Sequence, residues 1–235
     1  MKKNFLTVLK IFVLIALMTL IPGVSIHAAA PGQYKIDMQY DSAKAAIPAQ
    51  LKAGGRMQRS VIAVAEFADL RPVDDQKAIG WVKELDGSKV GVFPKTVAPT
   101  RAVADGIRDY LKKAGYQVAD KIVAWDLKEG SLPAGSGKVI IGGSIDELDI
   151  TCWTGVFSND YKINMKFSLV VADAARGKIL YKGNVSASAS RTDTSFSEGQ
   201  LGHEASVALA DAIGRLFEGK TVAEKLKEAI IPSSR

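Results

Sequence analysis

Two neighbouring segments in the second half of the chain alternate apolar and polar residues with a period of two. In residues 161–171 every second side chain is apolar, and polar residues such as Lys162 and Lys166 stand between them. Residues 179–189 show the same alternation, and the stretch 173–177 predicts a turn. Because successive side chains of a strand point to opposite faces, the pattern predicts two long antiparallel strands. One face of this sheet is apolar and covered, and the other is polar and open.

The residues before this pair predict the rest of the sheet. Residues 61–67 are apolar at both parities, which is typical of a central strand. Residues 139–145 predict a further strand. Between them, residues 80–85 and 88–93 flank Asp86-Gly87, a dipeptide that favours a β-hairpin with a type I′ turn.

Helical segments supply the cover for the apolar face. An apolar stripe at helical spacing follows Pro99 and ends at Gly115. A longer stripe begins after Ser197, a candidate N-cap, and a short helix at 222–230 finishes the chain. The predicted fold class is α+β: a two-layer sandwich with a mostly antiparallel sheet and helices packed on one face.

The domain prediction is one folded unit after a short arm. With 235 residues, 47% of them hydrophobic, the chain is long enough to bury one sizeable core. We expect residues 60–235 to form a single α+β domain. Residues 30–59 are mixed in composition and contain Gly54-Gly55, so we expect them to be a peripheral arm or linker, with a short strand within 34–40.

The first 29 residues have the order of a secretory signal peptide. Lys2 and Lys3 begin a basic segment, residues 11–21 form an apolar run, and small residues follow up to Ala30. The run is about half the ~20 residues that cross a bilayer as an anchor, so cleavage is favoured over a retained anchor. No cysteine follows the run, so lipid attachment is not expected. The predicted localisation is the periplasm.

Charge and cysteine content narrow the classes of partner. The formal charge is +6, and three of the positive charges (Lys2, Lys3 and Lys10) lie in the leader. The remaining charges are scattered, so nucleic acid is not expected, and a peripheral contact with anionic polymer or lipid stays open. Cys152 is the single cysteine, which excludes an intramolecular disulfide and predicts a buried thiol.

The motifs that enzymes need are incomplete. Residues 134–138 contain Gly-Ser-Gly-Lys, but they lack the first glycine and the following Ser or Thr of a P-loop. His203 falls within an amphipathic helix and is expected to be half-exposed. Asp146, Glu147 and Asp149 could serve a glycosidase, although acids at the end of a strand usually face water. We therefore expect no enzymatic activity, no cofactor and no metal.

Two groups of residues are candidates for partner binding. Asp69 and Arg71 directly follow the strand at 61–67, where loops often hold ligands. Alternatively, Asp69 caps a turn and Arg71 pairs with it. The second group is the polar face of the alternating pair, with Lys162, Asn164 and Lys166 on one strand and Asn184, Ser186 and Ser188 on the other.

The order of these features resembles the YajG-type family of Gram-negative envelope lipoproteins. The similar features are the strand at 61–67 with Asp69-x-Arg71, the helix that ends in Lys-Ala-Gly-Tyr-Gln-Val at 113–118, and Ile-Gly-Gly-Ser-Ile at 141–145. The Asp173-to-Ile179 turn and the alanine-rich final helix are similar too, so the match covers about 59–229. More distantly, the chain is similar to lipoproteins of curli and exopolysaccharide secretion. The family is usually lipid-anchored, unlike this chain.

The resemblance implies an accessory role in the envelope and no catalytic residues. Two functions follow as hypotheses. The first is a periplasmic binding or assembly module whose partners are envelope proteins, with a homo-oligomer as one form of assembly. The second is a hydrolase that acts on an envelope polymer, which would need a pocket with convergent titratable groups.

We expect signal peptidase to cut after Ala28 or Ala29, because Pro31 disfavours a cut directly before it. Intact-mass measurement on protein from a bacterial host should give a mature chain that begins at Ala29, Ala30 or nearby, and osmotic shock should release it. Retention of Met1, or release only by detergent, would contradict the prediction.

Overall fold

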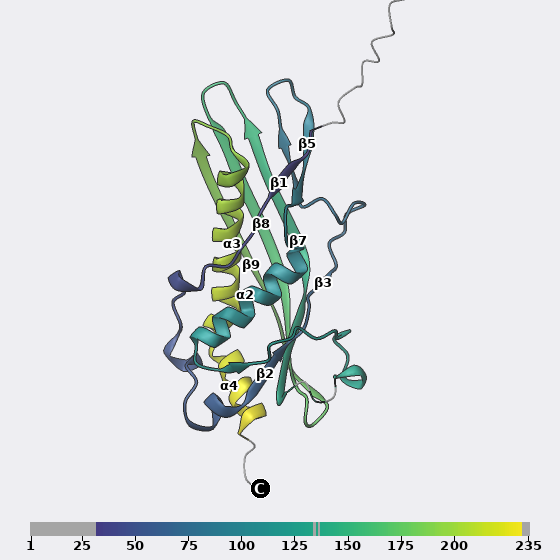
Figure 1. Cartoon of the computed structure of the whole chain (residues 1–235), viewed down its shortest axis with the longest axis vertical. Helices are drawn as coiled ribbons and strands as arrows, with labels where there is room; N and C mark the ends of the chain where they lie inside the picture. Colours follow the sequence, from purple (N-terminus) through teal and green to yellow (C-terminus); the bar gives the residue numbers. More distant parts are fainter. Residues whose placement is uncertain (1–31, 134, 136, 232–235) are drawn as a thin grey trace, which may run out of the picture. The chain divides into compact units, whose positions relative to one another are not determined.

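The computed structural model describes residues 32–133, 135 and 137–231, and the predicted signal peptide lies outside them. Gln33–Arg235 forms one compact unit. Its described residues contain nine strands in one open sheet and three helices (Figure 1). The strands are β1 (Tyr34–Ile36), β2 (Val61–Val64), β3 (Ala68–Asp69), β4 (Gly80–Lys83), β5 (Lys89–Pro94), β6 (Gln117–Val118), β7 (Val139–Thr154), β8 (Asn159–Asp173) and β9 (Lys178–Asp193). The helices are α2 (Pro99–Lys113), α3 (Glu198–Glu218) and α4 (Lys220–Ile230).

Strand β7 is the centre of the sheet. Along one side it pairs with β8 over its whole length, antiparallel, and β9 then forms the edge. Along the other side it pairs in succession with β2, β3 and β4, all parallel. The long antiparallel pairings hold most of the paired residues, so the predicted α+β class is confirmed. The parallel placement of the short strands was not predicted.

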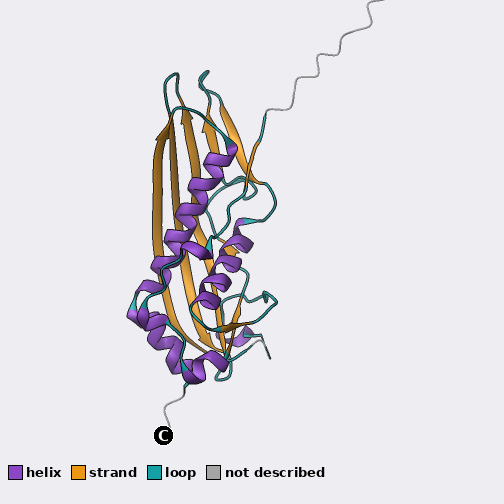
Figure 2. Ribbon diagram, turned by 60° about the vertical axis from the view of Figure 1, so that its left-hand side comes forward, coloured by secondary structure: helices purple, strands orange, loops and turns teal. Residues whose placement is uncertain are grey.

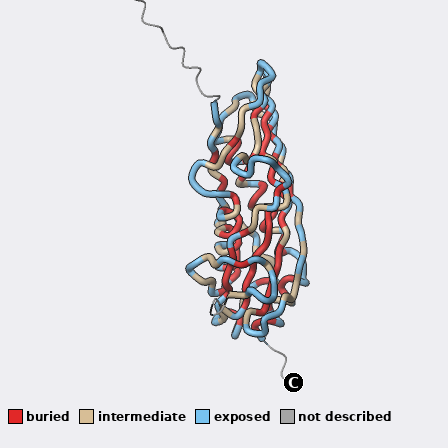
Figure 3. Tube along the Cα trace, turned by 90° about the vertical axis from the view of Figure 1, so that its right-hand side faces the viewer, coloured by how far each residue is buried: buried red, intermediate tan, exposed pale blue. Residues whose placement is uncertain are grey.

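The predicted faces of the alternating pair are confirmed in β8. Its apolar side chains from Tyr161 to Val171 are buried at every second position, whereas Lys162 and Lys166 are exposed. The three helices lie on the apolar side (Figure 2). The hydroxyl of Ser197 accepts the backbone N–H of Gln200 at 3.0 Å, which confirms the predicted N-cap of α3. The buried residues run through the interior of the folded unit, and the exposed residues lie around them (Figure 3).

The hairpin of β4 and β5 is confirmed, but its turn differs from the prediction. A type I′ turn needs positive φ at both central residues. Gly87 has a φ of 85°, whereas Leu127 is the only non-glycine with positive φ in the described part of the chain, so Asp86 has none. The Gly87 N–H donates to the Glu84 carbonyl at 2.9 Å, and Glu84 pairs with Ser88. This is the three-residue loop in which a glycine follows an ordinary turn.

The arm at 30–59 is not peripheral where the structure describes it. β1 pairs in parallel with β5, and Ile36 is 2% exposed. Leu51 and Met57 are buried in the same core as the helices. Isolated apolar residues in a polar stretch give no periodic signal, so their burial is decided by tertiary packing that the local sequence does not reveal.

The face opposite the helices is also partly covered. Ile140, Val170 and Trp125 belong to a second apolar cluster on that face, formed with the segment 119–132. Ile179 packs there too, although the alternation placed it with Tyr181 on the other face. A β-bulge explains the difference: Ala172 pairs with Ile179 and Val171 with Tyr181, so one extra residue reverses the parity.

Phe167 is fully buried in the core that also contains Leu209 and Ile213 of α3. Phe167→Ala should lower the free energy of unfolding by ~3–5 kcal/mol, because burial is lost and a cavity remains. Lys166→Ala, on the open face, should change it by no more than about 0.5 kcal/mol. Urea unfolding of both variants is the measurement, and equal effects would show that the two faces are wrongly assigned.

Candidate functional site

The polar face of β8 and β9 brings the predicted lysines together with hydroxyl groups. Lys162 and Lys166 are exposed, and Asn164 between them is half-buried. Across the strand pair, Lys166 lies opposite Ser186 and Asn164 opposite Ser188. Neither lysine forms an ion pair with another described residue, so both ammonium groups remain open to a partner.

The sequence missed a row of acids on the same face. β7 does not end at Ile145 but continues to Thr154, with Asp146 as the extra residue of a β-bulge. Beyond the bulge, Glu147 lies opposite Lys166 and Asp149 opposite Asn164. The face therefore carries acids on β7, bases on β8 and hydroxyls on β9. The sequence pattern did not predict the bulge. One extra residue in a strand changes whether the odd-numbered or the even-numbered side chains face outward.

The acids of this row differ in their surroundings. Asp146 is held by two hydroxyls, since Ser144 and Ser168 each donate to its carboxylate at 2.6 Å. Burial raises the pKa of Asp149, and the nearby charge of Glu147 raises it further. Lys162 and Lys89 act in the opposite direction on the pKa of Asp149.

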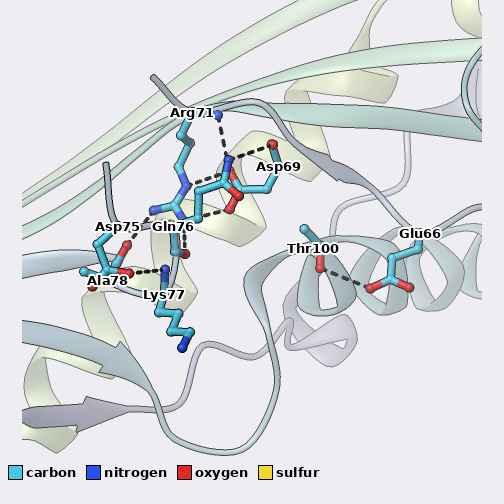
Figure 4. Close-up of polar contacts among 8 residues, drawn as sticks. All are labelled: Glu66, Asp69, Arg71, Asp75, Gln76, Lys77, Ala78 and Thr100. Atoms are coloured by element: carbon cyan, nitrogen blue, oxygen red, sulfur yellow. Dashed lines mark hydrogen bonds and ion pairs between the residues drawn. The ribbon is translucent and has the colours of Figure 1, made fainter. Parts of the chain in front are cut away.

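The second candidate, Asp69 with Arg71, is engaged within its own loop (Figure 4). The Arg71 side chain is 2% exposed, and its Nε and Nη2 donate to the two carboxylate oxygens of Asp69 at 2.9 and 2.7 Å. Nη1 and Nη2 also donate to the carbonyls of Ala78 at 2.8 Å and Gln76 at 2.6 Å. The guanidinium group thus holds the loop 70–79 in place. This agrees with the alternative prediction, in which Arg71 pairs with Asp69 instead of binding a ligand.

The structure does not bring the two candidate groups together. Asp69 in β3 pairs with Ile145 on one side of β7, whereas Lys162 and Lys166 lie on the other side. The loop and the polar face are therefore separate surfaces. Whether either binds a partner stays a prediction.

The side chains that could take part in catalysis do not converge on one site. Cys152 is 0% exposed, and burial raises the pKa of its thiol to about 12, so it is protonated at neutral pH. His203 is exposed on α3. A hollow of about 480 Å³ lies between 40–48 and α3, and two of its three acids are paired, Asp211 with Arg215 at 2.9 Å and Asp41 with Lys44 at 3.7 Å. No group of three or more metal-ligating side chains occurs in the described ranges.

Asp69→Asn should lower the free energy of unfolding by about 3 kcal/mol at pH 7, because the buried Arg71 loses its opposing charge. Hydrogen bonding to Arg71 lowers the pKa of Asp69 below its usual 3.8. The stabilisation by the Asp69 carboxylate is therefore present above about pH 4 and is lost as the pH falls through its folded-state pKa. Below that pKa, wild type and Asp69→Asn should have similar free energies of unfolding. Denaturant unfolding at about pH 7 and at the lowest pH at which both proteins still fold measures both effects.

Asp75→Asn is the matched control, since Asp75 is an exposed acid of the same loop. It should cost less than about 1 kcal/mol at either pH. A loss from Asp69→Asn no larger than that of the control would contradict the role of Arg71.

No family model and no curated protein matches the chain. Among solved structures, protein XCC0632 from Xanthomonas campestris is 8% identical with a TM-score of 0.49, and the alignment covers 84% of this chain and 99% of that one. A PelC dodecamer from Paraburkholderia phytofirmans is 16% identical with a TM-score of 0.37, covering 70% and 90%. Lipoprotein GNA1162 from Neisseria meningitidis is 16% identical with a TM-score of 0.31, covering 64% and 94%. Likenesses at this level carry no argument about function, and the resemblance to the YajG-type family is not confirmed.

Proposed function

We propose that the protein is an exported, non-enzymatic accessory protein of the bacterial envelope that binds another envelope protein through the polar face of β7, β8 and β9. The observation that carries the proposal is the row of unpaired lysines on β8, between acids on β7 and hydroxyls on β9. The contact surface consists of Glu147, Asp149, Lys162, Asn164, Lys166, Ser186 and Ser188.

Export is supported by the leader at 1–29, with its basic start and apolar run. No helix of the described ranges is long and apolar enough to cross a membrane. A periplasmic location makes proteins and polymers of the envelope the available partners and removes nucleic acid from reach.

The geometry of the face supports protein binding. Side chains on neighbouring strands lie about 5 Å apart, so acids, bases and hydroxyls form parallel rows with regular spacing. A partner with the complementary order of charges would be held in one register, because juxtaposed like charges disfavour the others. The short serines of β9 line a shallow hollow of about 230 Å³ together with Glu147 and Asn164, which leaves room for a side chain of the partner.

A hydrolase that acts on an envelope polymer is the alternative, and the raised pKa of Asp149 beside Glu147 is the observation in its favour. Glycosidases hold two carboxyl groups on either side of the bond that they cut. Here both acids stand on one strand of a sheet face, and only Glu147 lines the hollow of about 230 Å³ on that face, without Asp149. Binding is therefore the better-supported function.

Lys162→Gln with Lys166→Gln removes both charges without placing a new acid opposite Glu147. The thermal midpoint should stay nearly unchanged, because exposed charges add little to stability. Recovery of the native partner should fall at least about fivefold, since a loss of about 1 kcal/mol in binding has that effect. The measurement is affinity purification from the native envelope with quantitative mass spectrometry.

The matched control is Lys112→Gln with Lys220→Gln, which removes two exposed charges from the helical side. It should recover the partner in wild-type amounts. If the face variant also recovers the same partners in the same amounts, the polar face is not the interface.

A further inference from the structure

Two hairpin tips lie side by side at one end of the sheet. β4 runs parallel to β7, and Lys83 at the end of β4 pairs with Trp153 near the end of β7. The turn at 84–88 follows Lys83, and the turn at 155–158 follows Thr154, whose hydroxyl donates to the Lys83 carbonyl at 3.0 Å. Both turns therefore project from the same end at matched height (Figure 1).

These turns carry the most exposed large apolar side chains of the described residues. Phe157 is 89% exposed, Val156 78% and Leu85 67%. We call these three residues the apolar tip. They come from two separate turns, so they form a pair of protruding knobs. Burying such side chains away from water is favourable, and that gain needs a partner.

Aromatic and basic side chains form the next layer below the apolar tip. The rings of Trp81 and Trp153 meet edge to face with centroids 5.1 Å apart, and Lys89 lies 4.3 Å from the Trp81 ring. Tyr34 donates its hydroxyl to Glu84 at 2.5 Å. Proteins that enter a bilayer place apolar residues among the acyl chains and Trp, Tyr and Lys at the level of the headgroups. The apolar tip and the layer below it follow the same order.

We propose that the apolar tip inserts into the surface of a phospholipid bilayer. The β1 strand also begins at this end, because the hydroxyl of Tyr34, its first residue, donates to Glu84. Lys83 and Lys89 are outnumbered by Glu84, Asp86 and Asp160, so insertion is driven by apolar burial and not by attraction to anionic lipid. The inference assumes the export in the proposed function, and none of the three tip residues belongs to the polar face, which begins beyond the layer of Trp81 and Lys89.

Vesicle flotation tests the inference with the exported protein as purified from the envelope. Wild type should float with phosphatidylethanolamine–phosphatidylglycerol vesicles at both low and high salt. Val156→Ser with Phe157→Ser should reduce the bound fraction by about tenfold or more, because two apolar side chains are lost. Lipids brominated in their acyl chains should quench part of the tryptophan emission of wild type, since Trp81 and Trp153 adjoin the tip whereas Trp125 is buried in the second cluster.

Leu70→Ser is the matched control for Leu85→Ser, because the two leucines are 62% and 67% exposed and both lie in loops. Leu85→Ser should weaken flotation, whereas Leu70→Ser and the polar-face variant Lys162→Gln with Lys166→Gln should float as wild type does. Absence of wild-type flotation, equal flotation of the tip variant, or equal losses from Leu70→Ser and Leu85→Ser would overturn the inference. If wild type does not bind vesicles and the tip variant instead loses a protein partner, the apolar tip binds protein and the proposed insertion into a bilayer is wrong.

Discussion

The pairing of β7 on both of its sides is the constraint on which the rest of the structure depends. β8 occupies one side, and three short strands share the other, so β7 joins the two halves of the sheet. The bulge at Asp146 lets one strand serve both halves. Because one residue is added there, Leu148 and Cys152 face the helices as Ile145 does, although the strict alternation is broken. The same residue turns Glu147 outward.

This arrangement separates the core from the surfaces that remain for binding. The helices α2, α3 and α4 cover one face, and the segment around Trp125 covers part of the other near β2. What stays open is the stretch of the outer face with its rows of charge, together with the two turns beyond Lys83 and Thr154. The core thus accounts for stability, and we propose that the charged rows and the apolar tip serve two different kinds of contact.

The sequence predicts best the elements whose burial is uniform along their length. β8 lies under helices throughout, so its alternation alone identifies both faces. β7 changes parity at Asp146, and without that knowledge its acids read as the end of a strand. Leu51 of the arm is a single apolar residue whose burial depends on distant packing. The sequence singled out Asp69 and Arg71, but the inward turn of the guanidinium depends on the carbonyls of Gln76 and Ala78, which no pattern encodes.

The central claim is that the polar face meets an envelope protein while the helical side does not. A photo-crosslinking amino acid placed at position 166 on β8, and separately at exposed position 207 on α3, tests it in living cells. After illumination, covalent adducts are read by immunoblot and identified by mass spectrometry. The account predicts an adduct with an envelope protein from position 166 and none from position 207. The absence of an adduct from position 166, or adducts from position 207 alone, would contradict it.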